Sequence, residues 1–111
     1  MAFTAYHNVT GSTGVDVELL ATGDNASSIK SILLTNVHAT ADATVSLFIQ
    51  KLSTDSKASE TYYLLSTIAI PSDTALLLDN TNMLAFDNST SGFGLYVTVG
   101  SSDTVDVLIK R

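Results

Sequence analysis

Residues 61–79 read TYYLLSTIAIPSDTALLLD and are the most strongly patterned part of the chain. Aromatic and β-branched side chains fill the first half, and these residue types favour the pleated surface of a sheet. Pro71 fixes its own φ, lacks a backbone donor and biases Ile70 away from the helical region, which argues against a continuous helix. Pro71, Ser72 and Asp73 are turn-forming residues. The stretch predicts a strand, a turn and a second strand, and we expect this pair to be the central unit of an all-β domain.

Five further segments have the character of strands. Residues 15–20 alternate apolar and acidic side chains, the period-two pattern of a strand with one side in water. Residues 104–110 are expected to end the chain as a strand. Residues 29–37 are more continuously apolar, which predicts a central strand covered on both sides over part of its length. The remaining strands are expected at residues 44–52 and 93–99.

The alternation also predicts which side chains point into the core. In residues 44–52, Val45, Leu47 and Ile49 share one face and Phe48 points the other way. The inward residues expected in the last two strands are Phe93, Leu95, Val97, Val99, Val105, Val107 and Ile109.

Strands at about ten-residue spacing with short turns and no convincing helix are typical of an all-β sandwich. We predict a single antiparallel β-sandwich or jelly-roll-like domain of about seven to eight strands over residues 15–111. Residues 1–14 are mixed and turn-rich, and we predict an N-terminal arm there. Residues 83–86 are expected to be a small apolar plug between two polar turns.

The composition narrows the classes of function. Charged residues make up 14% of the chain, well below the roughly 25% of an average soluble domain. A neutral, hydroxyl-rich surface resists burial in a protein contact less than one covered with Lys and Glu. The net charge is −6 with only five Lys and Arg residues, so no basic face for phosphates can be assembled and nucleic-acid binding is not expected. The positive mean hydropathy argues against disorder.

No cysteine is present, which excludes disulfides and thiolate metal sites. Residues 1–8 lack the charged region and apolar core of a signal peptide, so we expect no export by that route. No apolar run approaches the roughly 20 residues needed to span a bilayer, and a membrane role is not expected.

No catalytic or metal-binding signature occurs in the chain, so we predict neither an enzyme nor a cofactor. His7 and His38 fall in predicted arm or loop positions without further ligands or an orienting acid at diagnostic spacing. Asp79 and Asp87 offer oxygen ligands for Ca²⁺, but their spacing matches no EF-hand. Acidic and amide side chains in turns mainly bond their own backbone, and this alternative stays open beside calcium.

Five residues are the candidates for a protein interface: Phe3, Tyr6, His7, Tyr62 and Tyr63. Phe3 and Tyr6 either pack on their own sandwich or anchor the arm on a neighbouring subunit, as aromatic residues do at interfaces. Tyr62 and Tyr63 place one ring on each side of a strand, which predicts one ring in the core and one on the surface. The outer ring would contact a neighbouring protein or a glycan.

Five features occur in order along the chain. They are AYHNVTG at residues 5–11, a strand over 29–36 ending in Thr-Asn, a YYLL strand at 62–65 leading through Ile-Pro at 70–71 to LLLD at 76–79, FDNS at 86–89 and VDVLI at 105–109. This order resembles small virion structural proteins of tailed bacteriophages, and the resemblance covers nearly the whole chain. The matching motifs are strand and turn patterns, and none of them is catalytic.

The resemblance implies a non-enzymatic β-sandwich that is made in the host cytoplasm and assembled onto a phage virion. Its expected role is capsid decoration, in which a cement protein binds and stabilises the head shell as a homo-oligomer. Partners would be the major capsid protein or other virion proteins. The alternatives are a neck, tail or fibre-associated virion protein and a carbohydrate-binding module using Tyr62, Tyr63 and Tyr96, which the absence of Trp weakens.

Overall fold

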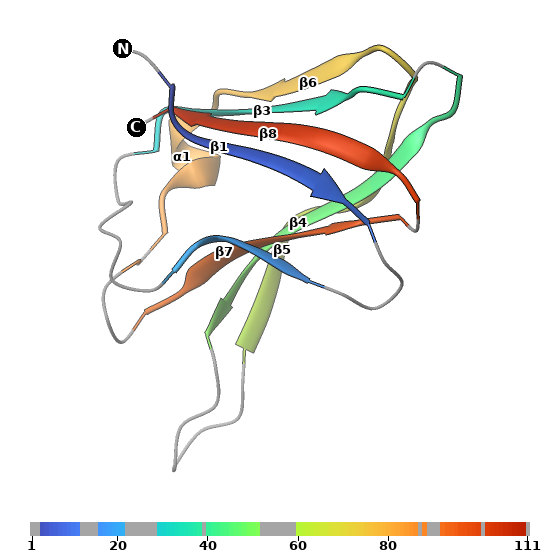
Figure 1. Cartoon of the computed structure of the whole chain (residues 1–111). Coiled ribbons are helices and arrows are strands. Elements are labelled where there is room, and N and C mark those ends of the chain that lie inside the picture. The colour runs from blue at the N-terminus through green and yellow to red at the C-terminus, as the bar shows by residue number, and fades with distance from the viewer. Residues whose placement is uncertain are drawn as a thin grey trace.

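The computed structural model describes residues 3–11, 16–21, 29–38, 40–51, 60–86, 88, 92–100 and 102–110 (Figure 1). Within these residues the chain forms eight strands and one short helix. Their bounds are β1 Phe3–Thr10, β2 Val17–Leu20, β3 Ser31–Asn36, β4 Ala43–Lys51, β5 Glu60–Ile70, β6 Ala75–Leu78, α1 Thr81–Leu84, β7 Gly94–Val99 and β8 Thr104–Lys110.

The strands form two four-stranded sheets that pack face to face (Figure 1). Sheet A has the strand order β1-β8-β3-β6, and sheet B has the order β2-β7-β4-β5. All neighbouring strands are antiparallel. The predicted all-β sandwich is therefore confirmed.

The pairing follows a simple rule along the chain. The first strand pairs with the last, β2 with β7, β3 with β6 and β4 with β5. The two halves of the chain thus run side by side as one long antiparallel ribbon that turns back between β4 and β5. The ribbon is distributed over both sheets, and the pairs β3 with β8 and β4 with β7 complete them.

Residues 61–79 form the predicted strand, turn and strand, with Asp73 in the turn at a φ of 53°. The prediction that this pair is the central unit is wrong. The turn at Pro71 carries the chain from one sheet to the other, so β5 ends sheet B and β6 ends sheet A. By contrast, β3 lies between β8 and β6, which confirms the prediction of a central strand over residues 29–37.

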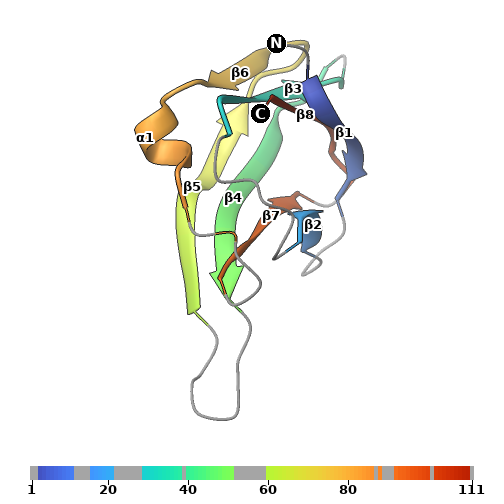
Figure 2. The ribbon, with the colours of Figure 1, turned by 90° about the vertical axis from the view of Figure 1, so that its left-hand side faces the viewer.

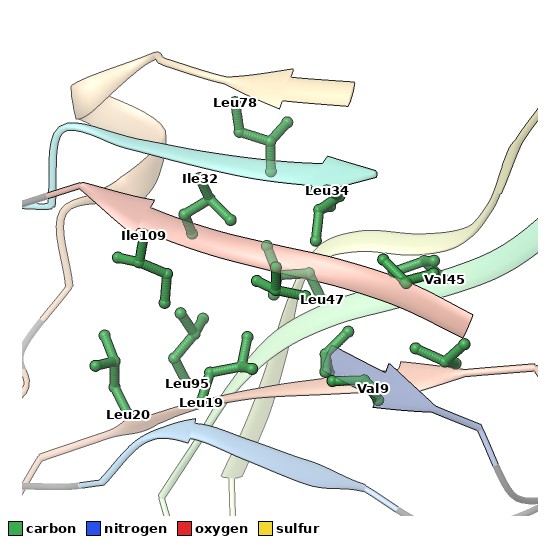
Figure 3. Packing of buried hydrophobic residues seen from close by; sticks show 14 of the residues in the cluster. Val9, Leu19, Leu20, Ile32, Leu34, Val45, Leu47, Leu78, Leu95 and Ile109 are labelled. Atoms are coloured by element: carbon green, nitrogen blue, oxygen red, sulfur yellow. The ribbon is translucent and has the colours of Figure 1, made fainter. Parts of the chain in front are cut away.

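The core lies between the sheets, where side chains from both meet (Figure 3). The inward directions predicted for β7 and β8 are confirmed, because Leu95 and Val97 are buried opposite Val107 and its neighbours. Phe93 is an exception, since it precedes β7 and is only half-buried. Complete burial of a Val, Leu or Ile side chain stabilises the folded state by about 1.5–3 kcal/mol. The largest fully buried side chains include Ile32, Leu34, Leu47, Ile70, Leu84, Leu95 and Ile109.

The N-terminal arm predicted over residues 1–14 is corrected over β1, which pairs with β8 along its length. The pairing places His7 beside Val107 and Val9 beside Val105, on the side of β8 that faces the core. Val9 is buried there. Asn8 and Thr10 are exposed on the opposite side of this edge strand. Residues 12–14 lie outside the described residues.

The apolar plug expected at residues 83–86 begins as one helical turn, α1, which the sequence pattern did not predict. Figure 2 shows α1 on the side of the sandwich where β5 and β6 end their sheets. Leu84 from this turn is buried and Phe86 packs against the core. The short helix therefore closes the interior at that side.

A buried asparagine joins the two sheets at one corner. Asn36, at the end of β3, is fully buried. Its Nδ2 donates hydrogen bonds of 2.9 Å to the carbonyl oxygens of Ala41 and Ile70, and its Oδ1 accepts one of 2.9 Å from the His38 amide. One side chain thus supplies a partner to three backbone groups, at Ala41, at His38 and at Ile70 of β5.

We predict that Asn36→Ala lowers the free energy of unfolding by about 3 kcal/mol, because it leaves buried backbone groups without partners. Urea denaturation would measure the loss. Asn8→Ala is the matched control, since Asn8 donates one exposed hydrogen bond of 2.6 Å to Asp106 Oδ1. The control should cost no more than about 1 kcal/mol. Equal losses for the two variants would contradict the role assigned to Asn36.

Candidate functional site

An aromatic row crosses three strands on the outer face of sheet B. The register places Phe48 of β4 beside Tyr63 of β5 and beside Tyr96 of β7. The Phe48 ring centroid lies 5.2 Å from that of Tyr63 and 5.8 Å from that of Tyr96. Phe48 is only 3% exposed although it is not part of the core cluster. The outward direction predicted for Phe48 is confirmed, and the two tyrosines cover its ring.

The three rings of this row differ in how much surface they leave for contact with another molecule. The rings of Phe48 and Tyr96 are nearly parallel, at 13°, so each presents a face to the other. Tyr63 is tilted by 45° and is 57% exposed. Tyr63 is therefore the ring of this row with the most surface left for contact with another molecule.

Acidic side chains of the β2 region fix the end of the row. The Tyr96 hydroxyl donates a hydrogen bond of 3.1 Å to Glu18 Oε2, and the Thr98 hydroxyl donates one of 2.9 Å to Asp16 Oδ1. Burial raises the pKa of Tyr96 above its ordinary value of 10.0, and the hydrogen bond and charge of Glu18 raise this pKa further. The charge of Asp16 acts in the same direction. These carboxylates hold exposed hydroxyl groups, which is a structural role.

Tyr62 lies on the other side of β5 and contacts Phe93. Their ring centroids are 5.8 Å apart at 62°, and Lys51 Nζ lies 4.8 Å from the Phe93 centroid. The prediction of one core and one surface tyrosine is wrong, because Tyr62 is 55% exposed and Tyr63 is 57% exposed. Both are near the start of β5, where β4 and β5 extend beyond the rest of the sandwich (Figure 1).

A second apolar row crosses the outer face of sheet A. The register aligns Tyr6 of β1 with Leu108 of β8, Leu108 with Leu33 of β3, and Leu33 with Leu77 of β6. Tyr6 is 66% exposed and Leu77 is 51% exposed, while Leu33 and Leu108 are half-buried. We call these four residues the sheet A row. It brings together apolar side chains from every strand of that sheet.

The structure does not gather the five predicted interface residues into one site. Tyr6 is on the outer face of sheet A, whereas Tyr62 and Tyr63 are on β5 of sheet B. Phe3 begins β1, and its side chain lies outside the described part. His7 was expected in an arm, but it is a half-buried strand residue on the core side. Its Nε2 is buried and has no hydrogen-bond partner among the described residues.

Sequence reasoning missed the three leucines of the sheet A row. Each is the middle of a three-residue apolar run, at residues 32–34, 76–78 and 107–109. Strict alternation would place a polar residue at the middle position of such a run. A continuous apolar run indicates a strand covered on both sides, as predicted for residues 29–37. The same reasoning, extended to residues 76–78 and 107–109, identifies the outward leucines.

The two candidate Ca²⁺ ligands, Asp79 and Asp87, are only partly described by the structure. Asp79 is exposed, and Asp87 lies outside the described residues. Asn88 is buried, and its Nδ2 donates hydrogen bonds to the carbonyl oxygens of Ala21 and Phe93 at 2.9 and 2.7 Å. Among the residues that the structure describes, no three His, Cys, Asp or Glu side chains are grouped as a metal site would need. His38 is exposed, as predicted.

Comparison with protein-family models, with curated proteins and with solved structures found no match. In the described part of the chain, no helix is long and apolar enough to cross a membrane. Exposed apolar side chains lie on both outer faces, with Tyr63 on sheet B and Tyr6 and Leu77 on sheet A. Val37, Tyr62 and Ile68 are exposed elsewhere.

We predict that Tyr96→Phe makes stability less sensitive to alkaline pH. A tyrosine with a raised pKa in the folded state ionises first in the unfolded chain, so its contribution is present below the unfolded pKa and is lost as pH rises through the folded pKa. The fall in the free energy of unfolding above pH 10.0 should be shallower in the variant. Urea denaturation across this range measures it, and identical pH slopes would contradict the prediction.

Proposed function

We propose that this chain is a non-enzymatic structural protein of a tailed-bacteriophage virion, acting as a capsid decoration or cement protein that binds the head shell and stabilises it. Its partners would be the major capsid protein and further copies of itself. It would be assembled in the host cytoplasm and be located in the virion. The proposal begins from the resemblance and is supported by the strand pairing and the outer faces.

The proposal includes a jelly-roll assignment for the sandwich. In a jelly roll, eight strands form two sheets from two Greek keys, an architecture found in viral capsid and lectin domains. A ribbon in which β1 pairs with β8, β2 with β7, β3 with β6 and β4 with β5 has this character. A fold alone does not establish a function, so the surface has to supply the rest of the argument.

The observation that carries the proposal is apolar exposure on the outer faces of both sheets. Tyr63 projects from sheet B, and Tyr6 and Leu77 project from sheet A. Exposed apolar patches of this kind are typical of protein contact surfaces. Two separate faces would let each copy bind the shell and another copy, which a shell-stabilising protein requires.

A neck, tail or fibre position is the rival within the same class. It would use the same surfaces, so the described residues do not separate it from decoration. The number of copies does. Symmetry fixes the copy number of each virion component, and a decoration protein occupies many equivalent positions on the shell.

A carbohydrate-binding module is the second candidate, because lectins also use jelly rolls. The observation in its favour is Tyr63, an exposed ring beside Gln50 and Thr61, whose side chains are joined by a hydrogen bond of 3.1 Å. Binding of oligosaccharides on a glycan array, abolished by Tyr63→Ala and retained in Tyr62→Ala, would move the assignment to this class. Tyr62 is equally exposed on the other side of β5 and serves as the control.

We predict that quantitative mass spectrometry of purified particles finds this chain at on the order of hundreds of copies, as repeated shell positions require. Particles assembled without the chain should lose their DNA at a lower temperature. Tyr63→Lys should reduce incorporation, because a charge would be buried in the contact. Ala69→Lys, exposed on the same strand, is the matched control.

The outcomes separate the candidates. A few to tens of copies would assign the chain to the neck, tail or fibre instead of the shell. Absence of the chain from purified particles would overturn the proposed function.

A further inference from the structure

The sheet A row lies on a face whose sequence indicates burial. Strands covered on both sides are continuously apolar, whereas strands with one side in water alternate. Three neighbouring strands of sheet A contain a continuous apolar run, at residues 32–34, 76–78 and 107–109. In each run the outer residues point to the core, and the middle residue belongs to the row. The isolated chain leaves this row partly in water.

The sheet A row crosses the strands, and charged residues lie on both sides of it along the strand direction. Positive residues lie on the side of Lys110, and negative residues lie on the side of Asp106. Along β8, Asp106 and Lys110 lie two residues before and after Leu108, so all three share the outer face. Lys30, which is exposed, donates its amide to the Lys110 carbonyl oxygen and adds positive charge at that end. Asp73, also exposed, lies beyond the opposite end of β3. Asp79 follows β6 at the Lys110 end, so the contrast in charge is carried by β3 and β8.

We propose that the outer face of sheet A binds the same face of a second copy of this chain, about a two-fold axis that runs along the sheet A row. Such an axis keeps each row residue opposite its own counterpart and reverses the strand direction. Leu108 then faces the partner's Leu108, and Asp106 faces the partner's Lys110. An isologous interface needs a self-complementary surface, and this arrangement supplies it twice.

The alternative axis along the strands fits less well. It would place Tyr6 opposite the partner's Leu77 and Leu108 opposite the partner's Leu33. Asp106 would then face the partner's Thr35, and neither charged residue of β8 would meet an opposite charge. The register therefore favours the axis along the row.

Sheet packing geometry is compatible with the charge pairs. Packed sheets lie about 10 Å apart and are inclined by about 30°. Asp106 and Lys110 are each about 7 Å from Leu108 along the strand, so this inclination displaces the paired residues by about 3.5 Å. A lysine side chain can accommodate such a displacement.

Pairing of copies through the β5 edge is disfavoured by irregularities in that strand. The β4–β5 register shifts twice, and each shift adds one residue to β5. One extra residue is Thr67, which has a φ of 53° and donates its amide to Ser46 Oγ at 2.9 Å. Bulges of this kind twist an edge away from a further strand.

The size of the face predicts a weak dimer in solution. Four strands at about 4.8 Å spacing and about six residues in length cover roughly 19 by 20 Å. The projected area is about 380 Å² per copy and about 760 Å² for the pair, which is below the roughly 1,200–2,000 Å² of stable specific interfaces. A weak dimer with a micromolar to millimolar dissociation constant is therefore expected. Copies held side by side on a particle would associate more strongly through their high effective concentration.

The test is sedimentation of the purified full chain from about 1 μM to about 1 mM, the range in which an interface of this size dissociates. We expect the mass to rise from 11.7 kDa to twice that value. Leu77→Lys should raise the dissociation constant at least tenfold. Tyr63 of sheet B is similarly exposed, and Tyr63→Lys should leave the dissociation constant unchanged.

Charge exchange tests the orientation. Asp106→Lys and Lys110→Asp should each weaken the dimer at least tenfold, and the double variant should return to within about threefold of the original, because the opposite pairs are restored. Circular dichroism and thermal melting confirm that each variant is folded. A variant that does not fold is replaced by Asp106→Asn or Lys110→Gln, for which a smaller weakening is expected.

Three results would overturn the proposal. They are a monomer at every concentration, a dimer lost in Tyr63→Lys and retained in Leu77→Lys, and an oligomer other than a dimer. A double variant that is weaker than both single variants would exclude the axis along the row. The experiment uses no virion, so its failure is distinguishable from failure of the proposed decoration function, which the copy number in particles tests.

Discussion

The interior between the two sheets accepts only one side of each strand, and the rest of the structure depends on this limit. Val107 and Ile109 of β8 face the interior together with Leu34 and Leu47, and all four are fully buried there. Leu108 lies between two of these residues in sequence and has to face the other way. The chain contains more apolar side chains than its single interior can hold, and the surplus lies on the outer faces.

Much of the fold could be predicted because alternation records which side of a strand is buried. The inward residues of β7 and β8 and the outward direction of Phe48 follow from this period. The central place of β3 follows instead from its continuously apolar run. Alternation does not record which strand lies next to which. Residues 61–79 were therefore placed at the centre, although the turn at Pro71 separates β5 and β6 into the edges of different sheets. The same limit explains the prediction of an arm in place of β1. The mixed sequence of β1 shows no strand pattern by itself, and its pairing with β8 makes it an edge strand.

The candidate site was harder to predict than the fold, because it depends on register across strands. Tyr6 and Leu77 lie far apart in sequence, yet the register of β1, β8, β3 and β6 places them in one row. No local pattern contains that relation. The aromatic row has the same origin, because Phe48 meets Tyr63 and Tyr96 from two different neighbouring strands. The prediction of His7 and Tyr62 as interface residues depends on residue type alone. In the fold, neither residue belongs to the sheet A row or to the aromatic row.

Both outer faces carry exposed apolar side chains and the chain has few charges, and we propose that another protein covers these faces. Hydroxyl-radical footprinting of the sheet A row tests this most directly, comparing Tyr6, Leu33, Leu77 and Leu108 in dilute chain, concentrated chain and particles. We predict that these residues are labelled in dilute solution and protected in both other states, while exposed Tyr63 of sheet B keeps its labelling in the concentrated chain. Equal labelling of the row in all three states would contradict the view that this face is covered by another protein.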